Sequence, residues 1–440
     1  MTYTKIRELG RGSFGIVDLV KDRRGKKWAR KTFAPPQIPG IDPADLRLRF
    51  EREVRYQQQI DHPNVVKIHD FDLSANPPWF VMELANCTLA NELTADRTLG
   101  GDPRMPLFDI LAGLQALHEK GYKHRDLSPG NVLKFDDGSG RTRYAISDFG
   151  LMSPQSGQTS TLTVTNMAGG TPLYSAPECA MNFKRATIQS DIYSVGAILH
   201  DIFGGGASRV PHSELSARGP IGPIIQKCTK KNLRRRYRNV ETLREDLYEA
   251  LTNNLITFSS AEEKEIVRLL QGNEALTEEQ WDLVFQQIDE NADRRQTNHA
   301  IFRATSIDHL EHLAVEAPDL FAALGEEFAA YMSESGFDFD YCDVIAGKAQ
   351  VFYDHGELDL QARITLATLK LGTSHNRWLV ERKFLKMAGP DISSPLARRI
   401  EVEIEVQGID FEAQVSHVER SLDVSRVSLH PALRELLETS

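Results

Sequence analysis

The stretch HRDLSPGN at residues 124–131 decides how the rest of this sequence is interpreted. It holds an aspartate, Asp126, and an asparagine, Asn131, in a polar segment between two apolar runs. A carboxylate in such a segment can accept and orient a hydroxyl proton. An asparagine amide oxygen is a ligand suited to a divalent cation. The segment therefore predicts proton transfer beside a bound metal.

Two other parts of the sequence fit the same chemistry. Asp148 in SDFG adds a carboxylate to the metal site predicted at Asn131, and a metal is needed where a transferred phosphoryl group is crowded with negative charge. Lys31 in ARK and Glu53 on a predicted helix form a lysine–glutamate pair that can hold phosphates. Either charge alone fits a solvated surface residue, but their order along the chain favours a functional pair.

A glycine-rich turn near the N-terminus lies between two strand-like runs. Gly10, Gly12, Gly15 and Val17 give the pattern GxGxxGxV, whose bare backbone can close over a triphosphate because no side chain stands in the way. The same pattern fits an ordinary tight turn. It indicates nucleotide binding only together with the motifs that follow it.

In this order the motifs resemble those of eukaryotic-type (Hanks-type) protein kinases over residues 1 to about 252. The signals are the glycine turn, ARK, Glu53, HRDxxxxN, DFG, APE at Ala176–Glu178 and DIYSVG at Asp191–Gly196. The resemblance implies an α+β, bilobal protein kinase fold, with a small antiparallel β-rich N-lobe and a helical C-lobe. It also implies ATP and Mg²⁺ as cofactors and proteins as substrates.

The resemblance assigns roles to the polar groups of the site. Lys31 would contact the α- and β-phosphates and pair with Glu53, while Asp126 would be the catalytic base. Asn131 and Asp148 would bind magnesium.

Other roles implied by the resemblance concern packing and the adenine ring. Asp191 would support the catalytic loop from a helix beneath it, and Glu178 would pair with Arg236. Apolar side chains would line the adenine site and two hinge residues would offer backbone hydrogen bonds; these are Val17, Ala29, Met82 and Leu133, with Glu83 and Ala85 in the hinge. Ordinary core packing is an alternative explanation for the same residues.

Ser128 departs from the family pattern, in which serine/threonine kinases have a lysine that reaches the γ-phosphate. One missing donor or cation at such a site costs roughly 100- to 1,000-fold in rate, or about 2.7 to 4 kcal/mol. We therefore expect a slow enzyme, or one whose activation loop or partner supplies the charge. The serine and the compact kinase region favour a bacterial source.

The segment GGTPLYSAPE favours Ser or Thr over Tyr as the acceptor, because Thr171 resembles the threonine that hydrogen-bonds the catalytic aspartate in serine/threonine kinases. The preceding loop is rich in hydroxyl groups, and activating autophosphorylation is predicted there, with Arg125 as the partner of the phosphate. The candidate acceptors are Thr159, Ser160, Thr161, Thr163 and Thr165. A merely flexible polar loop is the alternative.

Two other classes of protein share some of these features. A pseudokinase would bind nucleotide as a scaffold, but Lys31, Asp126, Asn131 and Asp148 are all present. A small-molecule phosphotransferase also uses an aspartate with an asparagine five residues later, but lacks an APE-type peptide-binding segment. The basic run KKNLRRRYR could suggest nucleic-acid binding, yet a solvated face with one buried arginine explains it better.

Residues 253–440 form a predicted second domain that carries no recognisable motif or visible repeat. It is expected to be mostly helical, with a β-hairpin where RRIEVEIEVQGIDFEAQVSHV alternates around Gly408. It holds 17 Lys+Arg against 34 Asp+Glu, whereas residues 1–252 hold 35 against 28. Acidity argues against nucleic acid there, and regulation, or capture of a basic substrate or partner, is the working hypothesis.

Composition, cysteine spacing and apolar stretches together predict where in the cell the protein is found. With 440 residues, 41% hydrophobic and 26% charged, it has the composition of a soluble globular protein. Its four cysteines, Cys87, Cys179, Cys228 and Cys342, show no metal-binding or disulfide spacing. The N-terminus has no apolar signal region and no stretch approaches the roughly 20 apolar residues of a membrane span, so we expect a cytoplasmic protein without membrane contact.

Overall fold

The chain divides into two compact units in a computed structural model, Met1–Leu251 and Thr252–Ser440. The structure describes residues 2–12, 15–35, 42–136, 142–148, 171–181, 186–252, 258, 260–272, 275–291, 298–334 and 336–439. Each unit is considered by itself. In the described ranges, no helix combines the length and the apolar character that a membrane crossing requires.

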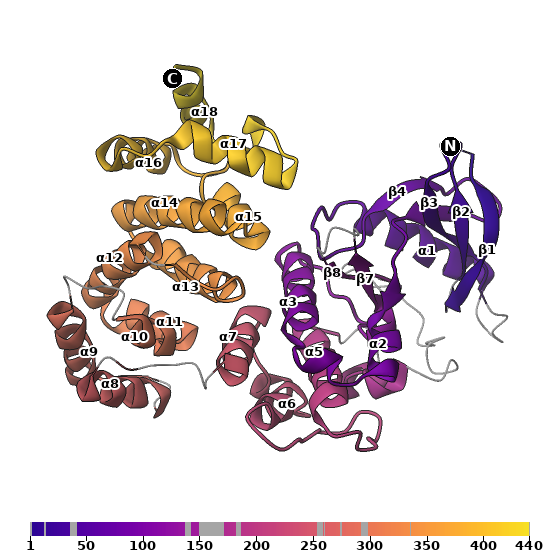
Figure 1. Ribbon diagram of the computed structural model, residues 1–440, viewed down its shortest axis with the longest axis horizontal. Helices are drawn as coiled ribbons and strands as arrows, with labels where there is room; N and C mark the ends of the chain where they lie inside the picture. The colour runs from indigo at the N-terminus through magenta and orange to yellow at the C-terminus, as the bar shows by residue number, and fades with distance from the viewer. Residues whose placement is uncertain are drawn as a thin grey trace. The chain divides into compact units, whose positions relative to one another are not determined.

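The first unit begins with a five-stranded antiparallel sheet in the order β1-β2-β3-β5-β4 (Figure 1). Its strands are β1 (Thr4–Gly12), β2 (Gly15–Lys21), β3 (Lys27–Phe33), β4 (Ile68–Asp72) and β5 (Trp79–Met82). Strands β2 and β3 lie where the sequence predicted strands, and they bury residues on both faces, in one apolar cluster with Phe50 and Val54 and in a second cluster with Val81. This confirms the β-rich N-lobe.

Helix α1 (Pro43–Gln57) covers this sheet and begins where the sequence indicated. The carboxylate of Asp42 accepts a hydrogen bond from the Ala44 N–H, and Pro43 occupies the first helical turn. Phe50 and Val54, four residues apart, pack into the apolar cluster of the sheet. The same helix carries the buried Glu53.

The remainder of the first unit is mainly helical and surrounds one apolar core. Its elements are β6 (Cys87–Thr88), α2 (Leu89–Ala95), η1 (Leu99–Gly101), α3 (Arg104–Glu119), η2 (Pro129–Asn131), β7 (Val132–Asp136), β8 (Thr142–Ile146), η4 (Thr171–Leu173), α4 (Pro177–Met181), α5 (Ile188–Phe203), α6 (Gly222–Cys228), η6 (Leu233–Arg235) and α7 (Val240–Thr252). Strands β6, β7 and β8 form a small antiparallel sheet. HRDLSPGN leads directly into β7, and Asp148 follows β8, so this β7–β8 pair brings both motifs to one edge.

Every described element of the second unit is helical. The helices are α8 (Ala261–Gly272), α9 (Glu278–Glu290), α10 (His299–Ala304), α11 (Ile307–Glu316), α12 (Pro318–Glu334), α13 (Tyr341–His355), α14 (Leu358–His375), α15 (Trp378–Met387), α16 (Ser394–Gln407), α17 (Phe411–Leu422), η9 (Arg426–Ser428) and α18 (Pro431–Thr439). From α11 onward they form four helix pairs, whose first helices begin at Ile307, Tyr341, Trp378 and Phe411, a spacing of 33 to 37 residues that is typical of helical repeats.

The pairs stack in two layers, which can be followed in Figure 1. Helices α11, α13, α15 and α17 contact one another in succession, as do α12, α14, α16 and α18. The sequence showed no repeat, because only the apolar spacing of the helices recurs and not the identity of the residues. This regularity is therefore visible only in the structure.

The β-hairpin predicted around Gly408 is wrong, since α16 and α17 occupy its place. Leu396, Ile400 and Ile404 recur every four residues and are buried in one cluster. Val402 and Val406, which created the apparent strand alternation, are 43% and 75% exposed. Gly408 ends α16 in the left-handed conformation, with φ 61°, instead of turning a hairpin.

Candidate active site

A buried lysine and two carboxylates meet between the sheet and β8. Lys31 on β3 and Glu53 on α1 are 2% and 1% exposed, and Lys31 Nζ lies 3.2 Å from Glu53 Oε1. Lys31 also pairs with Asp148, which follows β8. The Lys31–Glu53 pair predicted from the order of the motifs is thus present, and Asp148 joins it.

Burial and the opposite charges act against each other in this cluster. Burial alone would lower the pKa of Lys31, but Asp148 and Glu53 outweigh it and raise that pKa above its ordinary value. Burial raises the pKa of Glu53 to about 7, even though Lys31 opposes the change. For Asp148, Lys31 outweighs burial and lowers the pKa. The lysine therefore remains charged, with Asp148 as its ionised partner.

The HRDLSPGN segment is a turn held by its own backbone. The Asn131 side-chain NH₂ donates to the Asp126 carbonyl at 2.7 Å, and the Asn131 N–H donates to the Ser128 carbonyl at 2.9 Å. The Ser147 N–H donates to the Asn131 carbonyl at 2.8 Å, which fixes this turn beside Asp148. Asp126, Asn131 and Asp148 are thereby brought to one place.

Asp191 supports this turn from α5, as predicted. It is fully buried, and its two carboxylate oxygens accept hydrogen bonds from the backbone N–H groups of His124 and Arg125 at 2.9 and 2.8 Å. Arg125 has a φ of 67°, a conformation that costs energy for a residue with a Cβ, so these bonds offset local strain. His118 on α3 also contacts Asp191, with Nε2 2.9 Å from Oδ2.

One carboxylate oxygen of Asp126, the buried Oδ1, has no hydrogen-bond donor among the described residues and can accept a bond from a ligand. Burial and the nearby charge of Asp148 raise the pKa of Asp126 to about 8. A carboxylate tuned in this way holds or accepts a proton close to neutral pH.

The glycine turn is the β1–β2 hairpin, in which Gly12 lies opposite Gly15. A Cβ at Gly15 would meet the Thr32 carbonyl oxygen at 2.4 Å, so this position has no room for any side chain. A Cβ at Gly12 would lie 3.9 Å from Asp148 Oδ2. Gly12 thus lies close to the acidic end of the site.

An apolar cluster extends from the glycine hairpin to the link after β5. It contains all four residues predicted to line the adenine site and Ala85 of the predicted hinge; they are Val17, Ala29, Met82, Leu133 and Ala85. Ala29 and Met82 are paired across β3 and β5. The side chain of Glu83 pairs with Arg143, and its backbone follows directly on β5.

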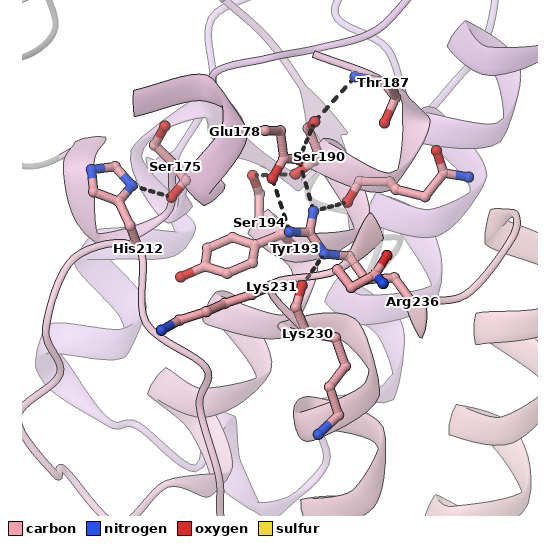
Figure 2. Close-up of polar contacts among 12 residues, drawn as sticks. Ser175, Glu178, Thr187, Ser190, Tyr193, Ser194, His212, Lys230, Lys231 and Arg236 are labelled. Carbon is pink, nitrogen blue, oxygen red and sulfur yellow. Dashed lines mark hydrogen bonds and ion pairs between the residues drawn. The ribbon is translucent and has the colours of Figure 1, made fainter. Parts of the chain in front are cut away.

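Glu178 and Arg236 form the second predicted pair, shown in Figure 2. Arg236 Nη1 and Nη2 donate to the two oxygens of Glu178 at 2.8 and 2.9 Å. The Ser190 hydroxyl adds a bond to Glu178 Oε1 at 2.7 Å. Burial alone would raise the pKa of Glu178, but Arg236 and Ser190 outweigh it and keep the carboxylate ionised.

Comparison with known proteins agrees with this arrangement. The sequence pattern of the protein kinase domain matches residues 3–303, which is more than half of the chain. The chain belongs to the protein kinase family.

Three curated relatives illustrate the similarity of this kinase. It is 33% identical over 242 residues to the serine/threonine-protein kinase AfsK of Streptomyces coelicolor, covering 50% of this chain and 28% of the relative. It is 30% identical over 274 residues to the probable serine/threonine-protein kinase PknB of Lactococcus lactis, covering 56% and 41%. For the ovarian-specific serine/threonine-protein kinase Lok of Drosophila melanogaster the identity is 31% over 212 residues, covering 46% and 44%. The kinase thus spans less than half the length of these relatives.

The donor groups of the site fit the ATP and Mg²⁺ that protein kinases use. Mg²⁺ is held in such sites by one or two protein oxygens together with phosphates and water, and Asp148 and Asn131 provide a carboxylate and an amide oxygen side by side. The buried, unpartnered oxygen of Asp126 adjoins them. Lys31 places a positive charge beside Asp148, where it would contact the phosphates.

The structure does not describe some of the residues that the sequence predicted to be functional. The side chain of Thr171 and the hydroxyl cluster at residues 159–165 lie outside the described residues. Sequence reasoning missed His118, Ser190 and Ser194, although Ser194 belongs to DIYSVG and Ser190 comes just before it. The signal for the two serines was this position beside Asp191 in the sequence, whereas His118, on α3, had no such signal.

Proposed function

We propose that this chain is an ATP-dependent serine/threonine protein kinase. The observation that carries the proposal is the convergence of the Lys31–Glu53 pair, Asp148, Asn131 and Asp126 at the edge of one apolar cluster. Four separate segments supply these groups, so local sequence effects do not explain the arrangement. Magnesium, when bound, would neutralise charge on the phosphates.

Each group has a proposed part in the transfer. Lys31 orients the α- and β-phosphates and is itself held by Glu53, while Asn131 and Asp148 hold the metal. The carboxylate of Asp126 orients the acceptor hydroxyl and takes its proton. The glycine hairpin covers the phosphates, and the apolar cluster around Ala29 and Met82 receives the adenine.

The serine/threonine specificity is supported by the names of the relatives and by the GT step at Thr171. We expect autophosphorylation among the hydroxyl groups at residues 159–165. Mass spectrometry after incubation with ATP and Mg²⁺ checks this, since absence of phosphate there would contradict it.

The function is tested by γ-phosphate transfer from labelled ATP to a Ser/Thr/Tyr peptide library. The wild-type chain should label Ser and Thr peptides, and Asp126→Asn should not. Nucleotide binding without transfer by the wild type would indicate a scaffold instead. Labelling of small metabolites in a lysate, but not of peptides, would indicate a small-molecule phosphotransferase.

We also propose that residues 1–252 form the kinase domain and that 253–440 form a regulatory or substrate-capturing domain. The division into two compact units supports the boundary, although the kinase pattern extends to residue 303. The excess of acidic residues in the second unit supports a basic substrate or partner. If so, the KM for a basic protein should rise more steeply with salt for the full chain than for a fragment of residues 1–252. Equal salt dependence would contradict capture by this domain.

A cytoplasmic location stays a prediction. It is supported by the four cysteines, all of which are free thiols in the structure.

A further inference from the structure

Hydrogen bonds to its backbone and to Glu178 attach the segment Tyr174–Glu178 to the rest of the first unit, and the buried Ala176 also packs against Tyr193. Its far end is fixed by the bonds of Glu178 to Arg236 and Ser190. Its near end is fixed by the Ser194 hydroxyl, which donates to the Tyr174 carbonyl at 2.9 Å. Ser190 and Ser194 lie four residues apart on α5, so one face of this helix holds both ends.

His212 makes the third attachment, from the connection between α5 and α6. Its Nδ1 lies 2.8 Å from the Ser175 carbonyl oxygen, as Figure 2 shows. A carbonyl oxygen can only accept, so Nδ1 carries the proton and donates it. The backbone in the middle of the segment is therefore hydrogen-bonded by an imidazole that is neither on α5 nor in any sequence motif.

The backbone at His212 is left-handed, with φ 61°. This conformation is uncommon for residues other than glycine, although asparagine, aspartate and histidine adopt it more often than the rest. Its neighbours keep it in place. The Tyr193 hydroxyl donates to the Ser213 carbonyl at 2.7 Å, and the Leu215 N–H donates to the Thr229 hydroxyl at 2.9 Å. These hydrogen bonds hold the loop, and with it the imidazole, in one conformation.

We propose that His212 is a positioning residue for the protein substrate. This inference rests on the proposed kinase function, in which the APE segment contributes to peptide binding. The imidazole fixes the Ser175 carbonyl, so the backbone of Tyr174–Glu178 presents one conformation to an extended peptide. Without this bond the Ser175 carbonyl loses its hydrogen bond to His212 and the backbone around it is less restrained, so that peptide binding must include the cost of ordering it.

Three substitutions separate the hydrogen bond from the backbone conformation. His212→Gly keeps the left-handed backbone at no cost and removes the donor. His212→Asn keeps both, because asparagine tolerates this conformation and its NH₂ group can donate. Ser213→Ala is the matched control, since it removes a neighbouring hydroxyl that bonds only within the loop, to the Val210 carbonyl at 2.7 Å.

The test is steady-state transfer from ATP to the best Ser/Thr peptide from a library. We expect His212→Gly to raise the KM for the peptide by about three- to tenfold, the effect of one hydrogen bond, with the KM for ATP changed less than twofold. His212→Asn should restore most of the peptide affinity, and Ser213→Ala should match wild type. An unchanged peptide KM in His212→Gly, or equal losses for ATP and peptide, would overturn the proposal.

Hydrogen exchange gives a readout that needs no activity. The amides of Tyr174–Glu178 should exchange faster in His212→Gly than in wild type or Ser213→Ala, without nucleotide or peptide. Unchanged exchange would overturn the proposal and leave the kinase function intact. Failure of the wild type to phosphorylate any peptide would instead overturn the proposed function, and the inference with it.

Discussion

Buried charges are arranged differently in the two units, although both contain them. In the first unit Lys31, Glu53, Asp126 and Asp148 converge, and oxygens of Glu53 and Asp126 have no hydrogen-bond donor among the described residues. In the second unit two fully buried charges, described next, are each satisfied by neighbouring groups, although one oxygen of Glu381 also lacks a hydrogen-bond donor among the described residues.

The second unit offers two examples. Arg377 donates to both oxygens of the fully buried Asp343 at 2.7 Å and lies over the ring of Phe339. Lys348, also fully buried, donates to the carbonyls of Phe302 and Arg303 at 2.9 Å. Burial of charge therefore does not by itself mark a site. A site is marked instead by charges that converge and include oxygens without a hydrogen-bond donor, because those oxygens remain able to bind a ligand.

The largest expected effect tests the converging charges. Asp126→Asn should lower the rate of phosphate transfer by about 10²- to 10⁴-fold, because a positioned base contributes that much. It should leave the fold intact, since it removes a buried carboxylate beside Asp148. Single-turnover rates and thermal unfolding check both parts. Asp136→Asn, an exposed carboxylate on β7, is the control and should retain the wild-type rate.

A substitution of similar energetic size in the second unit should change the free energy of unfolding and not the rate of phosphate transfer. Arg377→Leu should lower the free energy of unfolding by about 3 to 5 kcal/mol, because it leaves the Asp343 carboxylate buried without its partner. Arg398→Leu changes an exposed arginine on α16 and should stay within about 0.5 kcal/mol of wild type. Denaturant unfolding measures both. A small loss for Arg377→Leu would contradict the structural role given to the pair.

Ser128→Lys tests whether the first unit lacks a cation beside the reacting phosphate. Ser128 is partly buried at the start of η2, and its side chain makes no capping bond. A lysine there should raise the single-turnover rate, by up to about 100-fold if it supplies a full transition-state contact. Ser128→Ala, which adds no charge, should not. Equal rates for the lysine variant and wild type would show that the charge comes from elsewhere.

The pH dependence of stability tests the buried carboxyl group of Glu381 in the second unit. Glu381 is fully buried on α15, accepts a bond from the Ser421 hydroxyl at 2.6 Å and lies 3.2 Å from His417 Nε2. Burial raises its pKa despite Ser421, His417 and Arg382. The folded state therefore binds a proton that the unfolded state has lost, so Glu381 contributes stability at low pH that is lost as pH rises above its ordinary range near 4.5.

Glu381→Gln removes this dependence. Its melting temperature should gain on that of wild type as pH increases from 4.5 towards 8, as thermal scans across that range would show. A constant difference between the two proteins would contradict a raised pKa.

The smallest effect concerns the end of α16. Gly408→Ala should destabilise the second unit by about 1 kcal/mol, since alanine disfavours the left-handed φ of 61°. Val406→Ala, at a side chain that is 75% exposed, should have no measurable effect. A circular-dichroism spectrum of an α16–α17 peptide checks the assignment. A strand signal instead of a helical signal would contradict the helices and favour a β-hairpin.

The sequence by itself determined the family, the N-lobe strands, α1 and the identity of the reacting groups. These follow from local signals: alternation in β2 and β3, the Asp42 cap, and motifs whose chemistry needs particular side chains. The same local reasoning failed at α16, where the period-two run of valines was compatible with a strand. Leu396, Ile400 and Ile404 pack into the core around α14 and α18, and this packing selected the helix.

Only the tertiary structure decided which groups meet. Lys31 and Asp148 are 117 residues apart, and His212 bonds to a carbonyl 37 residues before it. Such contacts depend on how distant segments are folded together, whereas a local window records only the preferences of its own backbone. The same reason explains why the stacked helix pairs of the second unit left no repeat in the sequence: many apolar residues fill a core position equally well.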